Sequence, residues 1–192
     1  MATALYAAML EQIISTITSG SLCNVKLVCA PDSQHSIFHD LQKNYKIELG
    51  TQQGSDLGER MFQAASASLL TYKSVVLLGT DCLQMTEYEI GQSLAQLQNR
   101  SIDALVTPAY DGGYVLLGLN RIDQQIFSGI DWGTERVFEQ TENILQQMNW
   151  CWKQNPKLHD IDTIDDLKDV YKNEHQYRLN TGVRGLLQSI FD

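Results

Sequence analysis

The chain has 192 residues, of which 43% are hydrophobic, so it is long enough to form one globular domain around a sizeable core. Its formal net charge of −9 argues against a nucleic-acid-binding surface, because neutralising phosphates requires clustered Lys and Arg. No apolar run approaches the roughly 18 residues of a membrane span, and no basic segment precedes an apolar one at the N-terminus, so neither a span nor a secretory signal is expected. The cysteines form no CxxC pair and show no zinc-type spacing, which is typical of reduced thiols in a cytoplasmic protein.

The first half of the chain predicts helices that alternate with short strands. Apolar residues recur at helical spacing from Leu5 to Ile17, which predicts an amphipathic helix that stops at Gly20. The expected elements that follow are a strand at 25–30, a helical stretch at 35–43, a strand at 45–49, and a helix opened by a capping box of Asp56 and Glu59.

The second half continues the same alternation. Four consecutive apolar residues, Val75 to Leu78, predict a strand buried on both faces. The remaining expected elements are a helix from the Thr86/Glu89 capping box to about Leu97, strands at 104–107, 114–119 and 150–153, a helix at 134–148, and a helix that Thr163 caps and that ends near 170. Such alternation indicates βαβ units and therefore an α/β fold with a mainly parallel sheet.

The final segment, 171–192, is polar until four apolar residues near its end: Leu186, Leu187, Ile190 and Phe191. We expect them to form a short helix that docks on a domain spanning 1–170, and a helix that faces a partner is the alternative. At the other end, the chain opens directly with a helix, whereas a right-handed crossover begins with a strand. Either the opening helix is an appendage, or the strand that should precede it is absent.

Asp81 is expected at the carboxyl end of the strand that follows Ser74, where Gly79 and Thr80 allow a tight turn. In open α/β sheets, ligands bind beyond the carboxyl ends of the strands. Asp81 is therefore placed to hold a metal or a phosphate, and a turn aspartate that caps the next helix is the alternative. Cys82 is interpreted as a small packed residue rather than a nucleophile, because a neighbouring carboxylate raises the pKa of a thiol.

Two glycine-containing segments also indicate a site. Asp111 precedes Gly112 and Gly113 at the start of a strand, where glycine permits either a plain turn or a close approach of the backbone to a ligand. The segment Trp132-Gly133-Thr134 puts an aromatic residue at an expected helix N-terminus, whose free N–H groups can bind an anion. Simple capping is the alternative for that second segment.

Asp160 and Asp162 lie two residues apart, directly before a helix. In an extended segment such residues point to opposite faces, so only one is expected to join Asp81 on a metal. Carboxylate ligands on loops are typical of Mg²⁺ or Mn²⁺ when substrate phosphates complete the coordination. We therefore couple Asp81 with Asp162, and a surface role with helix capping is the alternative.

Five segments taken in order carry a family resemblance: Gln53-Gly54-x-Asp56-Leu57-Gly58-Glu59-Arg60-Met61, Leu78-Gly79-Thr80-Asp81-Cys82, Pro108-Ala109-x-Asp111-Gly112-Gly113-Tyr114, Trp132-Gly133-Thr134, and Asp160-Ile161-Asp162-Thr163-x-x-Asp166-Leu167. In this combination the chain resembles a bacterial family of GT-A-like transferases (domain of unknown function 2064). The family is usually described as glycosyltransferases, distantly similar to molybdopterin guanylyltransferase and phospholactate guanylyltransferase. The resemblance runs from the opening helix to about Val170.

The resemblance implies a three-layer, Rossmann-like fold of the nucleotide-diphospho-sugar transferase (GT-A) type. It implies that Asp81 and Asp162 bind Mg²⁺ or Mn²⁺, and that Asp111 faces the sugar or the acceptor as an orienting group or general base. Gln53 and Gly54 are expected to lie against the nucleotide base. The full set of candidate nucleotide-binding residues is Gln53, Gly54, Asp56, Gly79, Thr80, Gly112, Gly113, Trp132 and Thr134.

Two features depart from the family pattern. Leu83 occupies a position that is normally proline. The family also begins with a central strand and a basic Gly-Arg-x-Lys-Thr-Arg type loop that would hold base and phosphates, and this sequence starts after both. We therefore expect a sheet that lacks its usual first strand, so that strand 25–30 meets strand 75–79 directly or a second chain supplies a strand in a homo-oligomer.

The function expected from the resemblance is metal-dependent glycosyl transfer from a nucleotide-diphosphate sugar. Nucleotidyl transfer of the guanylyltransferase type is one alternative, and it releases pyrophosphate rather than a nucleoside diphosphate. A non-catalytic remnant that has lost nucleotide binding is the other. Its motivation is that, of the 14 Lys and Arg residues, only Arg60 and Arg136 lie in or next to a family motif.

Overall fold

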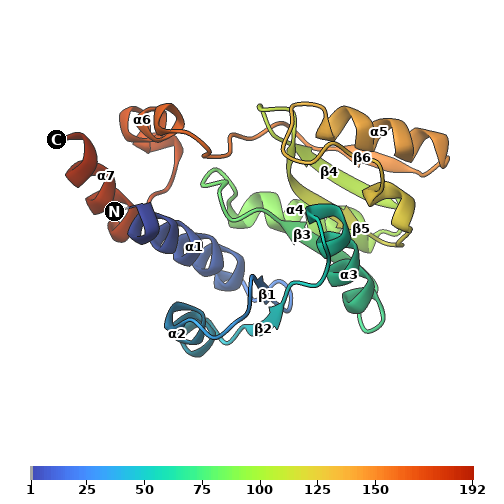
Figure 1. The fold of residues 1–192 in the computed structure, drawn as a ribbon, viewed down its shortest axis with the longest axis horizontal. Coiled ribbons are helices and arrows are strands. Elements are labelled where there is room, and N and C mark those ends of the chain that lie inside the picture. The colour runs from blue at the N-terminus through green and yellow to red at the C-terminus, as the bar shows by residue number, and fades with distance from the viewer. Residues whose placement is uncertain (1) are drawn as a thin grey trace.

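The computed structural model describes residues 2–192. Helices and strands alternate along most of the chain (Figure 1). The elements are α1 (Ala2–Ser19), β1 (Lys26–Cys29), α2 (Ser36–Tyr45), β2 (Glu48–Thr51), α3 (Leu57–Leu69), β3 (Val75–Leu78), α4 (Glu87–Gln98), β4 (Ala104–Pro108), β5 (Tyr114–Leu119), the 3₁₀ turn η1 (Gln124–Phe127), α5 (Val137–Gln147), β6 (Trp152–Gln154), α6 (Ile164–Lys172), the 3₁₀ turn η2 (Glu174–Gln176) and α7 (Thr181–Phe191).

The strands form two separate sheets. β1 and β2 pair in parallel, and the other four strands form a sheet in the order β3-β5-β4-β6. β4 and β6 pair in parallel, while β5 runs antiparallel to both of its neighbours. β3, β4 and β6 therefore share one direction, and the larger sheet is mixed because β5 lies between β3 and β4.

Helices cover both faces of the larger sheet, as the alternation of side chains along β4 requires. Leu105 packs with Leu97 of α4 on one face. Its neighbours Ala104 and Val106 belong to the cluster on the other face, together with Leu145 of α5 and residues of α3. The result is the expected three-layer α/β arrangement, with the core of the larger sheet between these layers.

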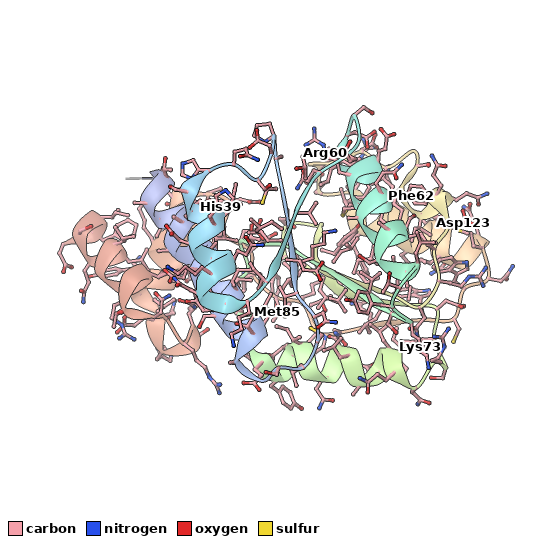
Figure 2. The ribbon with its side chains drawn as sticks, turned by 90° about the horizontal axis from the view of Figure 1, so that it is seen from below. His39, Arg60, Phe62, Lys73, Met85 and Asp123 are labelled. Atoms are coloured by element: carbon pink, nitrogen blue, oxygen red, sulfur yellow. The ribbon has the colours of Figure 1, made fainter. Side chains whose placement is uncertain are left out.

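α1 connects the two sheets. Leu10 and Ile14 pack in a cluster with apolar residues of β1 and β2. Met9 and Ile13 instead pack in the cluster that contains residues of β3 and β5. On its outer side α1 contacts α2, the helix that carries His39 in Figure 2.

The outer edge of β1 is not paired with another strand of the described chain. The N–H of Glu48 donates to the carbonyl of Val25, so alternate residues from Val25 onward face β2. The backbone groups of Lys26 and Val28 therefore point away from β2. The side-chain amide of Gln52 donates to the Val28 carbonyl at 3.2 Å and satisfies one of these groups.

β3 has an open edge of the same kind among the residues that the structure describes. The N–H of Gly79 donates to the carbonyl of Val115 in β5. By the two-residue period of a strand, the backbone groups of Val76 and Leu78 point away from β5. Val76 and Leu78 pack in one apolar cluster and Val75 and Leu77 in the cluster on the other face, so both faces of β3 are covered as expected. All four residues are nevertheless only partly buried.

The expectation that strand 25–30 meets strand 75–79 directly is wrong, because the two belong to different sheets. That expectation assumed a dry core, in which each unpaired backbone group costs about 1–3 kcal/mol. The partial exposure of β3 lets solvent satisfy these groups instead. A strand supplied by a second chain stays a prediction.

Three elements begin later in the chain than predicted. β2 begins at Glu48 because α2 continues to Tyr45 and Lys46 then adopts a left-handed backbone with φ of 54°. β6 begins at Trp152, after a similar left-handed residue that follows α5. α5 begins at Val137, because Thr134 lies in the preceding turn and donates its hydroxyl to the Asp131 carbonyl at 2.8 Å.

The C-terminal segment docks on the rest of the molecule, as predicted. α7 contacts both α1 and α6, and its Val183 and Leu187 are buried. The N–H of Asn180, at the start of α7, donates to the Gln12 side chain in α1 at 2.9 Å. No helix within residues 2–192 is long and apolar enough to cross a membrane.

Candidate functional site

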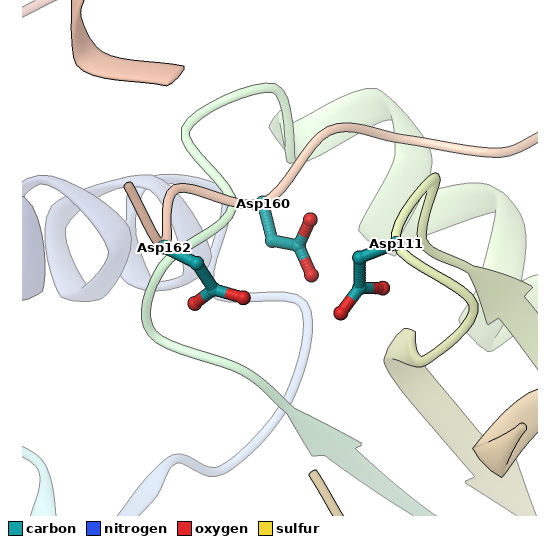
Figure 3. Close-up of side chains that lie close together, drawn as sticks. All are labelled: Asp111, Asp160 and Asp162. Atoms are coloured by element: carbon teal, nitrogen blue, oxygen red, sulfur yellow. The ribbon is translucent and has the colours of Figure 1, made fainter. Parts of the chain in front are cut away.

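Three carboxylates lie together beyond the ends of β4 and β6. One oxygen from each of Asp111, Asp160 and Asp162 lies within 4.8 Å of an oxygen of the others. Figure 3 shows the three side chains pointing toward one another from two loops, the turn between β4 and β5 and the segment before α6. We call Asp111, Asp160 and Asp162 the carboxylate cluster.

The pairing of β4 with β6 continues past both strands and holds the two loops of the cluster side by side. Ala109 and Leu158 form a parallel β-bridge, and the N–H of Leu158 donates to the Pro108 carbonyl at 3.0 Å. The site therefore lies at the carboxyl ends of parallel strands, where open α/β sheets bind their ligands.

The Asp-Gly-Gly turn positions Asp111. The N–H of Gly113 donates to Asp111 Oδ1 at 2.8 Å and fixes the carboxylate. Gly112 has a φ of +96°, and a Cβ there would collide with the backbone of Glu135. Its carbonyl accepts the N–H of Phe138 in α5 at 2.8 Å. Glycine is therefore required at position 112 because the backbone packs closely against the segment that leads into α5.

The segment before α6 is held by a helix cap. Asp166 accepts N–H groups from Asp162 at 3.1 Å and from Thr163 at 2.7 Å, so that Thr163, the expected cap of this helix, is part of a capping box with Asp166. Asp160 and Asp162 both join the carboxylate cluster, so the expectation that they point to opposite faces is wrong. The reason is that the segment is irregular rather than extended strand.

Asp81 lies beside the carboxylate cluster but is not one of its members. Burial raises the pKa of Asp81, and the charges of Asp162 and Asp111 raise it further. Asp81 is therefore close enough to these two carboxylates to interact with them electrostatically. A Cβ at Gly79 would lie 2.7 Å from Asp81 Oδ1, so the glycine leaves room for the carboxylate to turn back over the strand end.

The cluster carries excess negative charge. Burial, followed by the charge of Asp111, raises the pKa of Asp160 to about 6. Burial also raises the pKa of Asp162, and Asp111 and Asp166 add to that shift. Among the described residues, none of the ion pairs includes Asp81 or a member of the cluster.

The donor set suits a hard divalent cation. Carboxylate oxygens are the ligands that Mg²⁺ and Mn²⁺ prefer. Ligand bonds near 2.1 Å put two oxygens on opposite sides of one ion roughly 4.2 Å apart. The spacing within 4.8 Å in the cluster is close to this value, so small side-chain rotations are sufficient to bind one ion.

Gln53, Gly54 and Asp56 lie at the start of α3. Gly54 has a φ of +139° and packs so closely on α3 that a Cβ would lie 2.8 Å from the N atom of Arg60. Asp56 caps the helix by accepting the Glu59 N–H at 2.7 Å, and Gln53 is exposed. The contacts of this segment are with α3 itself, as the position of Arg60 in Figure 2 illustrates.

The other predicted binding residues have structural contacts. The Trp132 ring packs edge-on against Tyr114, with centroids 6.3 Å apart, and Trp132 also lies against Gly58 of α3. Thr80 shares a 3.1 Å hydrogen bond with the Tyr6 hydroxyl of α1. Thr134 lies in the turn before α5 rather than at its first residue.

Sequence reasoning assigned no final role to Asp160 and none to the aromatic residues next to the cluster. Tyr110 directly precedes Asp111, and His159 directly precedes Asp160. Their rings stack, with centroids 4.0 Å apart and an angle of 14° between the planes. Adjacency to two candidate carboxylates was the only signal in the sequence that could have identified them.

The chain is similar to one known protein family and to solved structures. A family model described as "Uncharacterized protein conserved in bacteria (DUF2064)" matches residues 13–134. A solved structure described as a putative nucleotide-diphospho-sugar transferase from Desulfovibrio desulfuricans G20 superposes with a TM-score of 0.83 at 26% identity, over 96% of this chain and 81% of that chain. No curated protein matches the sequence significantly.

A second solved structure, a cytidylyltransferase from Leptospira borgpetersenii serovar Hardjo-bovis (strain JB197), superposes with a TM-score of 0.54 at 14% identity. That match covers 90% of this chain and 87% of the other, and it concerns the fold alone. The fold of this chain is thus the α/β fold of a nucleotide-diphospho-sugar transferase. Because the family model covers most of the chain, the protein belongs to the bacterial DUF2064 family.

Proposed function

We propose that this protein is a glycosyltransferase that uses a nucleotide-diphosphate sugar and a Mg²⁺ or Mn²⁺ ion. The observation that carries the proposal is the carboxylate cluster, whose three oxygens lie within 4.8 Å of one another at the carboxyl end of the sheet. The likeness to a protein described as a putative nucleotide-diphospho-sugar transferase supports the substrate class.

In this proposal Asp160 and Asp162 hold the ion, with Asp81 beside them at the end of β3. Burial raises the pKa of each of these carboxyl groups, and the charges of neighbouring carboxylates, Asp111 among them in every case, raise it further. A bound cation would relieve this repulsion. The bound ion would supply neutralisation of the leaving diphosphate. Asp111 is exposed and engages the Gly113 N–H through Oδ1. It is the residue we assign to orient the acceptor hydroxyl and to accept its proton.

The candidate nucleotide-binding residues stay part of the proposal. Gln53 and Gly54 are proposed to contact the base from the exposed start of α3. Asp56, Gly79, Thr80, Gly112, Gly113, Trp132 and Thr134 are proposed to shape the binding surface through the backbone conformations and packing described above.

Calorimetric titration with Mn²⁺ tests the metal site directly. Asp162→Asn and Asp160→Asn are expected to weaken Mn²⁺ binding by at least about tenfold, because each removes one charged ligand from a site with few protein ligands. Asp165→Asn is the matched control, since Asp165 is exposed and pairs with Lys168 outside the cluster. Equal Mn²⁺ affinity in all three variants would contradict the metal assignment.

Titration with several nucleotide sugars, with and without Mn²⁺, then tests the activity. Metal-dependent binding tighter than roughly millimolar, about −4 kcal/mol, supports a functional transferase. Absence of such binding supports the non-catalytic remnant. Release of a nucleoside diphosphate identifies glycosyl transfer, whereas release of pyrophosphate identifies the nucleotidyltransferase alternative.

We also propose that a second chain completes the sheet in a homo-oligomer. The support is that the outward backbone groups of Val76 and Leu78 in β3 pair with no other described strand. Addition of a strand to an open sheet edge would satisfy them. Light scattering coupled to size-exclusion chromatography measures the mass, and a strict monomer at all concentrations would contradict this proposal.

A further inference from the structure

An exposed aromatic ring lies directly beside the carboxylate cluster. Tyr110 is 60% exposed, although one face of its ring stacks on His159 at a centroid distance of 4.0 Å. Most of the exposed area must therefore belong to the opposite face and the edges of the ring. Tyr is enriched at binding surfaces because its ring is apolar and its hydroxyl is polar, and here the ring is also held in place by a stacked neighbour.

The position of this ring is fixed by the backbone. Tyr110 and His159 follow the bridged residues Ala109 and Leu158, so the stack extends the β4–β6 pairing by one residue on each side. The N–H of His159 also donates to the Gln84 side chain at 2.8 Å, which ties the stack to the loop after Asp81. The ring is thus oriented before any ligand arrives, which lowers the entropic cost of binding.

A cation lies near the same ring. The ammonium of Lys157 is 6.0 Å from the Tyr110 ring centroid, at the outer limit of a cation–π contact. Lys157 lies over the ring, but at this distance its ammonium is not packed against it. An ammonium at this ring provides a positive charge for an anionic part of a substrate.

We propose that Tyr110, stacked on His159 and close to Lys157, forms a subsite for the flat face of a substrate ring that carries a phosphate. The ring is a nucleobase or a pyranose, because both present a flat face to an aromatic side chain. The phosphate lies toward Lys157. The assignment of the ring to a nucleotide sugar or its acceptor rests on the proposed function, whereas the stacking itself does not.

The subsite is tested without metal, so that its outcome is independent of the proposed metal site. Neutral nucleosides (guanosine and uridine) and methyl α-glucoside are titrated while the NMR signals of Tyr110 and its neighbours are followed. A shift with a nucleoside identifies a base subsite, and a shift with the glucoside identifies a sugar subsite. If none of these probes shifts the Tyr110 signals, the proposal is overturned.

Variants then show whether the ring itself binds. Tyr110→Ala is expected to weaken binding of the effective probe between about 5- and 150-fold, the range found for loss of a stacking aromatic. Tyr110→Trp retains a flat ring and is expected to restore the affinity. Tyr88→Ala is the matched control, since Tyr88 is 69% exposed on α4 outside the subsite. Equal affinity of Tyr110→Ala and the unaltered protein overturns the proposal.

Lys157→Gln provides a second measurement that does not depend on the folding of the Tyr110 variants. It is expected to weaken binding of the nucleoside 5′-monophosphate or sugar phosphate at least about threefold more than binding of the neutral probe. An unchanged ratio overturns the role of Lys157. Failure of Mn²⁺ to bind the unaltered protein would contradict the proposed function and leave these metal-free results in force.

Discussion

Asp160 carries an unusual electrostatic cost for a single side chain. Burial and the charge of Asp111 raise its pKa from the ordinary 3.8 to about 6. Between these two values the folded protein binds more protons at this group than the unfolded chain does. Protonation of Asp160 therefore stabilises the folded protein. This contribution to the free energy of unfolding is fully present below about pH 4 and is lost as the pH rises through about 6.

Asp160→Asn removes this titration. In buffer without divalent cations, the variant is expected to lose the part of the pH dependence between pH 4 and 6.5 that Asp160 contributes, on the order of 1 kcal/mol after solvent screening. It is also expected to be more stable than the unaltered protein at pH 7. Urea unfolding at several pH values measures both effects, with Asp165→Asn as control. The same slope in both variants would show that Asp160 is not strained by its neighbours.

Gly112 gives a residue-scale prediction that separates packing from backbone conformation. Both Gly112 and Gly133 have positive φ, of 96° and 78°, but only Gly112 would bring a Cβ into the backbone of Glu135. We expect Gly133→Ala to cost about 1 kcal/mol, the conformational penalty alone. Gly112→Ala should cost at least about 2 kcal/mol more, because two backbones must separate. Chemical denaturation of both variants tests this, and equal losses would contradict the packing role.

At the scale of elements, the sequence predicted best where a signal is local. The capping box at Thr86 forms as expected, Thr163 caps α6 as expected, and both helices begin directly after these residues. At α3 only half of the expected box forms, because Glu59 binds Ser55 instead of the Asp56 N–H. At α5 the cap residue Thr134 is used in a turn, so the helix starts later.

Longer-range features were less predictable. Four apolar residues in β3 indicate a strand but not whether both of its edges are paired, since pairing depends on segments far away in the chain. For the site, motif spacing indicated Asp111 and Asp162, but it could not indicate that Asp160 turns to the same side. That outcome depends on the irregular backbone between the Leu158 bridge and the cap at Thr163.

The open edge of β3 gives an element-scale prediction. In a dilute solution the amides of Val76 and Leu78, which point away from β5, are expected to exchange with solvent at least about tenfold faster than those of Leu116 and Leu117 in the central strand β5. If a second chain adds a strand, protection at Val76 and Leu78 rises with protein concentration. Amide hydrogen exchange measured by NMR distinguishes the cases. Slow exchange that does not depend on concentration would show that the edge is already paired.

At the scale of the whole molecule, α1 and α7 bind the two sheets and the site into one structure. α1 contributes to the clusters of both sheets. The first of these clusters also contains Leu187 and Val183 of α7 and Val170 of α6. The segment that carries Asp160 and Asp162 leads into α6, and Asp166 of this helix accepts the Asp162 N–H. The C-terminal segment is therefore packed into the core that supports the carboxylate cluster.

This arrangement predicts that the segment 171–192 does not unfold separately from the rest. Leu187 is 1% exposed, and Leu187→Ala is expected to lower the free energy of unfolding by about 2–4 kcal/mol in a single transition, because it leaves a cavity in the shared core. Gln188→Ala is the control on the exposed side of the same helix. Circular dichroism and the fluorescence of the tryptophans in the distant α3–α5 core report the two regions. Coincident transitions in both signals support one cooperative unit, whereas an early transition seen by circular dichroism alone would show that the C-terminal segment is an independent appendage.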